Sequence, residues 1–545
     1  MAAPTTPTAP ATPTAPTAPP DTLSGSGVPL ARLLTGLRPP EEVARTFLRR
    51  GWWRTETVLH DVYRGAARHP HRTAIVSHQS HRPAASRVTR LSYAQLAAFT
   101  GRFAHALDAL GVRPGDPVAF QLPSRWETVA LLLACLRSGA VAVPIMPGYG
   151  ARDLQAVLEA AEPRLCVVPD RWEGTAPGQV LAGLAPRLPW LRHRAVLGDT
   201  VDPGAVDFLR HFVHTPHERY RRAGWLRLPA RGADRVAVAV TSLGMAAAHS
   251  MALHTPNSLH ASLPSAAQPG GAAFSALPPA SLPALLHTVI GPLTRGGTVV
   301  LQDVWDADGA LALMASAQVG QVYATPAQWT ELAAARERRP REAVELSGAY
   351  TSDPAGTSAA LGRRVETGFG VPPRALPRSA ARTACERDAE GAPYRLGSRG
   401  PASPLAVWRR AAGTTVTWEE DGAAAEHDLD EWGHPRLRTE EVGGVFLVPV
   451  TEIETLLLRH PGVAEAAVVA RADARHGELP YAVVVPDGTP PTLPQLRGHL
   501  SDHGVPPAHL PAGLVLMGAL PRTDSGDLRR RELQEAVTRR TSRAA

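Results

Sequence analysis

The chain is 545 residues long and carries 57 basic and 50 acidic residues, which gives a formal net charge of +7. Every one of the basic residues is arginine, because the sequence contains no lysine. A chain without lysine lacks the ammonium group that reaches a phosphate in P-loop proteins, and it cannot form a Schiff base through a lysine amine. Arginine does not replace a lysine that must lose its proton, since guanidinium stays charged.

The bulk composition describes a large globular protein. Hydrophobic residues make up 44% of the chain and charged residues 20%. Three widely separated cysteines without metal-site spacing indicate buried thiols in a reducing compartment. The sequence shows no signal-peptide pattern, and the most apolar stretch, 274–293, contains four prolines, which favours buried core over a membrane span. We therefore expect a cytoplasmic protein that binds neither nucleic acid nor a membrane.

The first half of the chain alternates predicted strands and helices. Residues 1–28 form a Pro/Ala/Thr-rich tail, which predicts disorder. Ser92 and Gln95 form a capping box ahead of apolar residues at helical spacing, so a helix is expected to end at Gly111. The elements predicted next are strands at 118–122, 141–145 and 165–168, with helices at 126–138 and 151–161.

The second half begins with a stretch, 170–235, that is predicted to be irregular. Further strands are expected at 236–240, 298–302 and 321–324, followed by an irregular charged segment at 374–440. Beyond that segment we expect a helix through Ile453, Leu456 and Leu457, with strands at 463–469 and 481–485. Repeated strand–helix–strand units predict an α/β fold with a mostly parallel sheet. We expect a large α/β domain over 29–432 and a small α+β domain over 433–545.

Several segments resemble a known family, and together they cover nearly all of the chain from residue 40 onward. They are PEEVARTFLRRGWW (40–53), the segment 91–145 from LSYAQL to VAVPI, FSALPPASLPALLHTVIGPLTRGGTVVL (274–301), QVYATPAQWTEL (321–332), EIETLLLRHPGVAEAAVVA (452–470) and LPRTDSGDLRRREL (520–533). Their order resembles the adenylate-forming superfamily of acyl- and aryl-CoA synthetases, nonribosomal adenylation domains and luciferases. Within that superfamily, the quoted segments most resemble those of aryl-acid AMP ligases and cyclic-acid CoA ligases. The resemblance implies that superfamily's fold, with a large N-terminal domain of several subdomains and a small C-terminal domain.

The resemblance also implies a chemistry. The family activates a carboxylic acid with Mg·ATP to an acyl-adenylate and then passes the acyl group to a thiol, so ATP, Mg²⁺, an acyl or aryl acid and a carrier protein are the implied cofactors and partners. Cations placed in advance must stabilise the charge that develops at the α-phosphate. The corresponding positions of this chain depart from the family pattern in four places.

The first departure lies in the family's phosphate loop, which follows a strand and ends in Pro-Lys-Gly. It resembles residues 241–259 here, TSLGMAAAHSMALHTPNSL. The remnants of the motif that the resemblance implies are Thr241, Ser242, Gly244, Thr255 and Asn257. The glycine- and hydroxyl-rich run has become Met-Ala-Ala-Ala, which favours helix over an open phosphate nest. The lysine position is His249 or Ser250, so we expect weak binding of triphosphate.

The second and third departures concern magnesium and ribose. The family's stacking aromatic aligns with Leu376 and its magnesium-ligating Glu with Ala380, with no carboxylate nearby before Glu386. Magnesium requires oxygen ligands, so no metal site is predicted. The Thr-Gly-Asp ribose segment is missing, and the loosely placed candidates are Asp421, Asp428 and Asp430. The hinge Asp aligns with Arg438.

The fourth departure is at the catalytic lysine of the family's C-terminal Pro-x-x-x-x-Gly-Lys motif. This chain reads PRTDSGD from 521, which places Asp527 at the lysine position. An anion there turns attraction to the carboxylate and α-phosphate into repulsion. Arg529 and Arg530 are weak substitutes, displaced along the chain.

Three functions stay open on these residues. The chain is a non-catalytic homologue that partners a carrier protein or biosynthetic enzyme, or a repurposed enzyme acting with ATP on an acyl or aryl acid or an aryl amine through another residue set. The third possibility is residual adenylation with Arg in place of Lys.

Two groups of histidines carry no metal prediction. His211, His214 and His217 do not share a helical face, because Pro216 interrupts the helix, and they are interpreted as a polar loop. The scattered group from His60 to His81 is interpreted as solvated surface.

Overall fold

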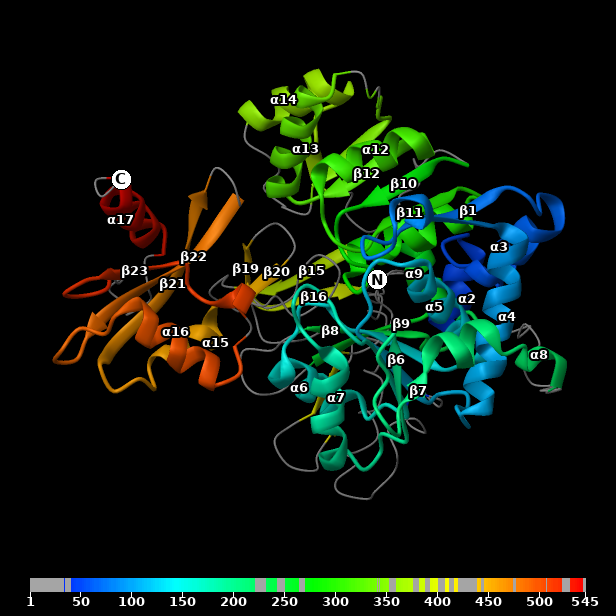
Figure 1. Ribbon diagram of the computed structural model, residues 1–545, viewed down its shortest axis with the longest axis horizontal. Helices are drawn as coiled ribbons and strands as arrows, with labels where there is room; N and C mark the ends of the chain where they lie inside the picture. The colour runs from blue at the N-terminus through cyan, green and yellow to red at the C-terminus, as the bar shows by residue number, and fades with distance from the viewer. Residues whose placement is uncertain are drawn as a thin grey trace, which may run out of the picture.

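The computed structural model (Figure 1) combines two large sheets with a smaller C-terminal unit. It describes residues 34, 41–220, 232–242, 250–263, 270–340, 342, 344–351, 359–375, 382–387, 393–399, 407–410, 416–419, 439–442, 446–473, 477–505, 507–521 and 530–542. The predicted tail at 1–28 lies outside these residues.

One sheet has nine strands within the described part of the chain, in the order β18-β17-β9-β8-β4-β3-β5-β6-β7. Neighbours from β8 to β7 run parallel, whereas β8–β9, β9–β17 and β17–β18 are antiparallel. The strands are β3 (Pro117–Phe120), β4 (Val141–Pro144), β5 (Leu165–Pro169), β6 (His193–Leu197), β7 (Val206–Asp207), β8 (Val238–Ser242), β9 (Ser250–His254), β17 (Val407–Arg410) and β18 (Val416–Glu419). The central strands β3, β4 and β5 are buried along their whole length, which explains their unbroken apolar sequences.

The second sheet has seven strands among the described residues, in the order β14-β13-β12-β10-β11-β1-β2. All neighbours are parallel except β1 and β2. The strands are β1 (Thr73–His78), β2 (Val88–Ser92), β10 (Ala272–Ser275), β11 (Thr298–Gln302), β12 (Val319–Ala324), β13 (Gly348–Thr351) and β14 (Arg374–Ala375). The predicted strands at 298–302 and 321–324 are confirmed as β11 and the end of β12.

Helices fill the space between the sheets and also cover their outer faces. The main hydrophobic core joins residues of both sheets, such as Ile75 and Val118, to α3 (Val58–Arg68), α4 (Tyr93–Ala109), α5 (Trp126–Ser138) and η5 (Leu285–Ile290). A second core packs α6 (Ala151–Ala161) and α7 (Pro177–Leu184) on the nine-stranded sheet. A third packs α12 (Ala307–Ala317), α13 (Pro326–Arg338) and α14 (Ala359–Phe369) on the seven-stranded sheet.

The predicted helix ends are confirmed at several positions. The Ser92 hydroxyl accepts a hydrogen bond from the Gln95 amide, and the Gln95 side chain accepts one from the Ser92 amide, which completes the capping box of α4. Gly111 follows α4 with a φ of 73°, and Gly139 ends α5 with a φ of 71°. Both conformations are left-handed, where glycine has no steric penalty.

The C-terminal unit is the small α+β domain that the sequence predicts. Its sheet pairs β21 (Val463–Asp473) antiparallel with β22 (Gly477–Pro486), and β22 parallel with β23 (Gly513–Leu516). One face packs on α15 (Val450–Leu457) and α16 (Leu493–Asp502), and the other on α17 (Arg530–Ser542). In Figure 1 this unit stands to one side of the two large sheets. The predicted boundary at 432/433 lies outside the described residues and stays a prediction.

Two predictions of irregular structure were wrong. The stretch 170–235 contains α7, β6, β7, a π-helix η3 (Leu209–His214) and α8 (His217–Tyr220), and 374–440 contains five strands or parts of strands beyond β14 among its described residues. The proline- and arginine-rich composition of these segments indicates irregular structure, although tertiary packing holds short helices and strands there. The elements not yet bounded are α2 (Glu41–Arg49), η1 (Ala84–Ser86), η2 (Ala185–Arg187), α9 (Pro256–Ala261), α10 (Leu282–Ala284), α11 (Gly291–Thr294), β15 (Arg382–Arg387), β16 (Pro393–Arg399), β19 (Thr439–Val442), β20 (Phe446–Pro449) and η7 (Pro507–His509).

Two burial predictions are confirmed where the structure describes the side chains. Cys135 and Cys166 are free and buried, and the apolar stretch 274–293 lies in the cores between the sheets. In the described part of the chain, no helix is long and apolar enough to cross a membrane.

Candidate functional site

The candidate phosphate loop lies between β8 and β9. Thr241 and Ser242 end β8, and Ser242 pairs with Ser250, the first residue of β9. Gly244 and His249 fall in 243–249, outside the described residues. The loop therefore leaves the carboxyl end of β8, which is the edge of a parallel sheet at which ligands usually bind.

Thr255 and Asn257 have partners within the scaffold. Thr255 is fully buried and caps α9, because its hydroxyl accepts a hydrogen bond from the Ser258 amide at 3.0 Å. Asn257 is 1% exposed, and its side-chain oxygen accepts a hydrogen bond from the Arg54 amide at 3.0 Å. The Asn257 side-chain nitrogen donates to Asp234 at 2.7 Å. Thr255 thus fixes the start of α9, and Asn257 holds it against the arm that precedes α3.

A crevice lies where strands of both sheets end. It is a cavity of about 30 Å³, lined by residues that follow β3, β5, β10 and β11, among them Ser124, Trp172, Glu173, Asp303 and Trp305. β3 lies between β4 and β5, and β10 lies between β11 and β12. At both places the next strand in sequence is added on one side of the first strand and the following strand on its other side. Such switch points are the usual ligand sites of open α/β sheets. We call this cavity the carboxyl-edge crevice; its volume suits about one water molecule.

Asp303 anchors the wall of the carboxyl-edge crevice. Its side chain is fully buried directly after β11 and accepts hydrogen bonds from the amides of Ser80 and Val304, both at 2.9 Å. The Arg125 guanidinium, which precedes α5, donates to the same carboxylate at 3.1 and 3.3 Å. This ion pair connects the end of a strand in one sheet to a helix that follows a strand of the other.

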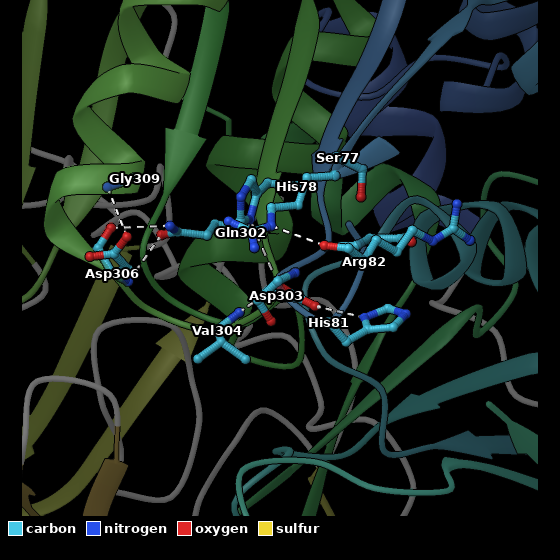
Figure 2. Close-up of polar contacts among 12 residues, drawn as sticks. Ser77, His78, His81, Arg82, Gln302, Asp303, Val304, Asp306 and Gly309 are labelled. Carbon is cyan, nitrogen blue, oxygen red and sulfur yellow. Dashed lines mark hydrogen bonds and ion pairs between the residues drawn. The ribbon is translucent and has the colours of Figure 1, made fainter. Parts of the chain in front are cut away.

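Two histidines, His78 and His81, lie beside Asp303, as Figure 2 shows. Their Nδ1 atoms lie 3.9 and 3.8 Å from the Asp303 carboxylate oxygens. Burial lowers the pKa of both imidazoles, which outweighs the attraction of Asp303. The interpretation as solvated surface was wrong for His78, whose side chain at the end of β1 is only 16% exposed, and it is confirmed for His81, whose side chain is 49% exposed.

Glu173 adds a second carboxyl group to the carboxyl-edge crevice. Burial raises its pKa, and the negative charge of Asp303 raises it further. Glu173 as a whole residue is exposed, whereas the Asp303 side chain is fully buried. Sequence reasoning missed Asp303, Arg125 and Glu173, because no motif marks residues that meet only when two sheets come together.

Gln302 and Asp306 fix the chain next to the carboxyl-edge crevice. In Figure 2 the Gln302 amide reaches the Asp306 carbonyl, a hydrogen bond of 3.0 Å. The Asp306 carboxylate accepts a hydrogen bond from the Gly309 amide at 2.9 Å, which caps α12. These contacts hold the turn that presents Asp303.

The side chains of His211 and His217 make hydrogen bonds to the main chain, and that of His211 reaches α4. His211 Nε2 lies 3.1 Å from the Ala106 carbonyl oxygen, and His217 Nε2 lies 3.0 Å from the His211 carbonyl oxygen. Within the described residues, no three histidines, cysteines or carboxylates are grouped so that they could hold a metal ion.

The remaining predicted site residues fall mostly outside the described residues. Asp527 and Arg529 lie in 522–529, and Arg530 is the first residue of α17. The aligned positions Leu376 and Ala380, the ribose candidates Asp421, Asp428 and Asp430, and the hinge position Arg438 lie outside as well, whereas Glu386 belongs to β15.

Comparison with known proteins relates both domains to one family. Residues 62–206 match the model of the AMP-binding enzyme family, and residues 452–527 match its C-terminal domain. A salicylyl-CoA synthase / salicylate adenylyltransferase of a Streptomyces species is 27% identical over 91% of this chain and 97% of its own. A salicyl-AMP ligase / salicyl-S-ArCP synthetase of Mycobacterium tuberculosis is 27% identical over 91% of this chain and 93% of its own.

The fold is shared with a solved structure. The amide bond synthetase McbA from Marinactinospora thermotolerans superimposes with a TM-score of 0.64 at 18% identity, covering 89% of this chain and 100% of that one. The predicted α/β fold with a large N-terminal and a small C-terminal domain is thereby confirmed. The chain belongs to the adenylate-forming superfamily, and it is similar to that superfamily's aryl-acid AMP ligases and CoA ligases.

Proposed function

We propose that this chain is a degenerate adenylate-forming ligase, which keeps the fold but does not adenylate a carboxylic acid by the family's usual chemistry. It acts as a non-catalytic or repurposed homologue in a natural-product or acyl-activation pathway. The observation that carries the proposal is Asp527, which stands at the position of the family's catalytic lysine in a chain that has no lysine at all.

The charge at that position decides the chemistry. The family's lysine contacts the substrate carboxylate and the α-phosphate, both of which are anionic. A carboxylate at the same place repels both groups, and the repulsion strengthens as the site closes and water leaves. Arg529 and Arg530 do not restore the contact, because they sit two and three residues further along the chain.

The phosphate-loop remnants support the same proposal. Thr255 and Asn257 make their hydrogen bonds within the scaffold, so a scaffold role accounts for both residues without a nucleotide. The intervening Met-Ala-Ala-Ala run supplies neither the glycines nor the hydroxyls that wrap a triphosphate.

The residues also fit Mg²⁺ poorly. Ala380 takes the place of the family's magnesium-ligating Glu, and the described residues contain no group of carboxylates or histidines arranged for a metal. We therefore assign neither ATP nor Mg²⁺ as a resident cofactor.

The names of the relatives indicate a substrate class and a partner. The two relatives described above act on salicylate, and the name of one includes a carrier protein, ArCP. We propose an aryl acid as ligand and an acidic carrier protein or pathway enzyme as partner.

Pyrophosphate exchange over a panel of aryl acids tests the proposal, with salicylate included. We expect no exchange and no increase in melting temperature with Mg·ATP, because a ligand that binds only the folded state would raise that temperature. Exchange above background would overturn the proposal. It would favour instead an active ligase that uses ATP through a non-standard residue set.

A further inference from the structure

A second cavity opens at the opposite, amino-terminal edge of the seven-stranded sheet. Its volume is about 260 Å³, and most of its lining residues stand before or at the starts of β10, β12 and β13 or on η5 and α11, whereas Tyr323 is the fifth residue of β12. The carboxyl-edge crevice lies beyond the other end of β10 and shares no lining residue with this cavity, so the two sites are separate. We call this second cavity the amino-edge cavity.

Tyr323 offers the amino-edge cavity a buried hydrogen-bond donor. The side chain lines the cavity and is 2% exposed. Its ring lies between His287 and Tyr350, with centroid distances of 4.9 and 4.8 Å and interplanar angles of 12° on both sides. Burial raises the pKa of Tyr323, so the phenol keeps its proton. Within the described part of the chain, its hydroxyl makes no hydrogen bond, so it can donate one to a ligand in the cavity.

Arg295 supplies the positive charge of the amino-edge cavity. It follows α11, lines the cavity and is half-buried. Burial lowers the pKa of the neighbouring His287 to about 3, and the charge of Arg295 adds to this shift, so the imidazole is neutral at pH 7. Glu345 is the carboxylate among the described lining residues, and it is exposed. The interior of the cavity thus combines one guanidinium with neutral donors, a set suited to an anion.

The rest of the lining is small and leaves room for a flat ring. Five of the lining residues are glycine or alanine, namely Gly271, Ala272, Ala273, Gly291 and Gly320. A Cβ atom added at Gly271 would meet no atom within 4 Å. A cavity of about 150 Å³ is enough to bind benzene in an apolar core. The volume here therefore accommodates a single ring together with a carboxylate group.

We propose that the amino-edge cavity binds a monocyclic aromatic carboxylate, with the carboxylate facing the Arg295 guanidinium and the Tyr323 hydroxyl. The ligand would accept the hydrogen bond that Tyr323 does not make within the described protein. The site is independent of the function proposed above, since it uses none of the nucleotide-site positions.

Calorimetric titration of the full chain with benzoate, at neutral pH and without ATP, tests the site. Benzamide is the uncharged control of the same shape. We expect benzoate to bind and benzamide to bind at least about tenfold more weakly, because a hydrogen bond to a charged group contributes more than one to a neutral group. No binding of benzoate, or equal binding of the two compounds, would overturn the proposal.

Matched variants locate the binding. Tyr323→Phe removes only the hydroxyl and should weaken benzoate binding about tenfold or more. Tyr350→Phe makes the same change in the next ring of the stack, which does not line the cavity, and should leave the affinity within about twofold. Gly271→Val should fill the space and abolish binding, with its melting temperature measured to show that it folds. Equal effects of the two tyrosine variants would contradict the assignment.

A stable salicyl-adenylate analogue separates this site from the adenylate site of the fold. Benzoate binding that is unchanged in the presence of the analogue supports the amino-edge cavity, whereas competition between the two places benzoate elsewhere and overturns the inference. If the analogue itself does not bind, that result supports the function proposed above, and the tyrosine pair still decides the location.

Discussion

The Arg125 guanidinium donates to the Asp303 carboxylate at 3.1 Å. This contact joins the start of α5, which follows β3 of the nine-stranded sheet, to the end of β11 in the seven-stranded sheet. The Arg125 side chain is 11% exposed and that of Asp303 is fully buried. The pair therefore lies where the two large sheets meet, at the wall of the carboxyl-edge crevice.

Breaking this pair should destabilise the large domain strongly. Arg125→Met leaves the buried Asp303 carboxylate without its cation, and we expect a loss of about 3–5 kcal/mol in the free energy of unfolding. Urea unfolding followed by tryptophan fluorescence measures the change.

Two variants control that measurement. Arg338→Met breaks a pair with Asp308 in which the side chains are 56% and 34% exposed, and it should cost no more than about 1 kcal/mol. The double variant Arg125→Met/Asp303→Leu removes both charges and should recover much of the loss. If Arg125→Met cost no more than Arg338→Met, the buried pair would have no special part in joining the sheets.

The scaffold could be predicted from the sequence because its signals are local. The capping box at Ser92, the glycines that end α4 and α5, and the apolar strands β3 to β5 each depend on residues close in the chain. The prediction of irregular structure in two segments was wrong because the structure there depends on contacts that are not local in the chain. Short elements such as β6 and η3 are held by contacts with distant residues, which local composition does not reveal.

The candidate site divides in the same way. The family motifs marked Thr255 and Asn257, yet their partners, Ser258 for one and Arg54 and Asp234 for the other, became visible only in the fold. Asp303 and His78 are 225 positions apart, and the sequence placed His78 on a solvated surface as one of several histidines scattered over a charged loop. A motif can name a residue, but its environment depends on long-range packing.

Asn257 should behave as a structural residue. Asn257→Ala removes the acceptor of the Arg54 amide and the donor to Asp234 in a site that is 1% exposed. We expect a loss of about 1–3 kcal/mol in the free energy of unfolding, since buried partners are left unsatisfied. Urea unfolding measures it, with Gln155→Ala, at a partly exposed position of α6, as control. A variant of normal stability would argue that Asn257 is kept for a ligand instead.

Acid should reveal the burial of His287. Its pKa in the folded chain is about 3, against 6.5 for the ordinary side chain, so the unfolded state takes up a proton that the folded state does not. The stability that neutral His287 contributes is complete above pH 6.5 and is lost as the pH falls toward 3. The slope is at most about 1.4 kcal/mol per pH unit.

The measurement compares wild type with His287→Gln in urea unfolding at several values between pH 7 and pH 4.5. The stability advantage of the wild type should shrink as the pH falls. The pKa of Glu127 is raised by burial, so its contribution changes in the opposite sense, but it is common to both proteins and cancels. The exposed His71→Gln serves as control. A stability difference that did not change with pH would show that His287 titrates normally.

Asp527 should be the position at which a single change improves nucleotide binding. Asp527→Lys exchanges repulsion of a phosphate for attraction, and at about 4 Å in water the two effects together amount to about 2 kcal/mol, or roughly thirtyfold in the dissociation constant of AMP. Calorimetry with AMP measures that change, and Asp524→Lys adds the same charge three residues earlier as a control. Pyrophosphate exchange should stay absent in Asp527→Lys, because the phosphate loop and the magnesium ligand are still altered. If both lysine variants bound AMP equally, the effect would be one of net charge, and Asp527 would not occupy the position that the family resemblance implies.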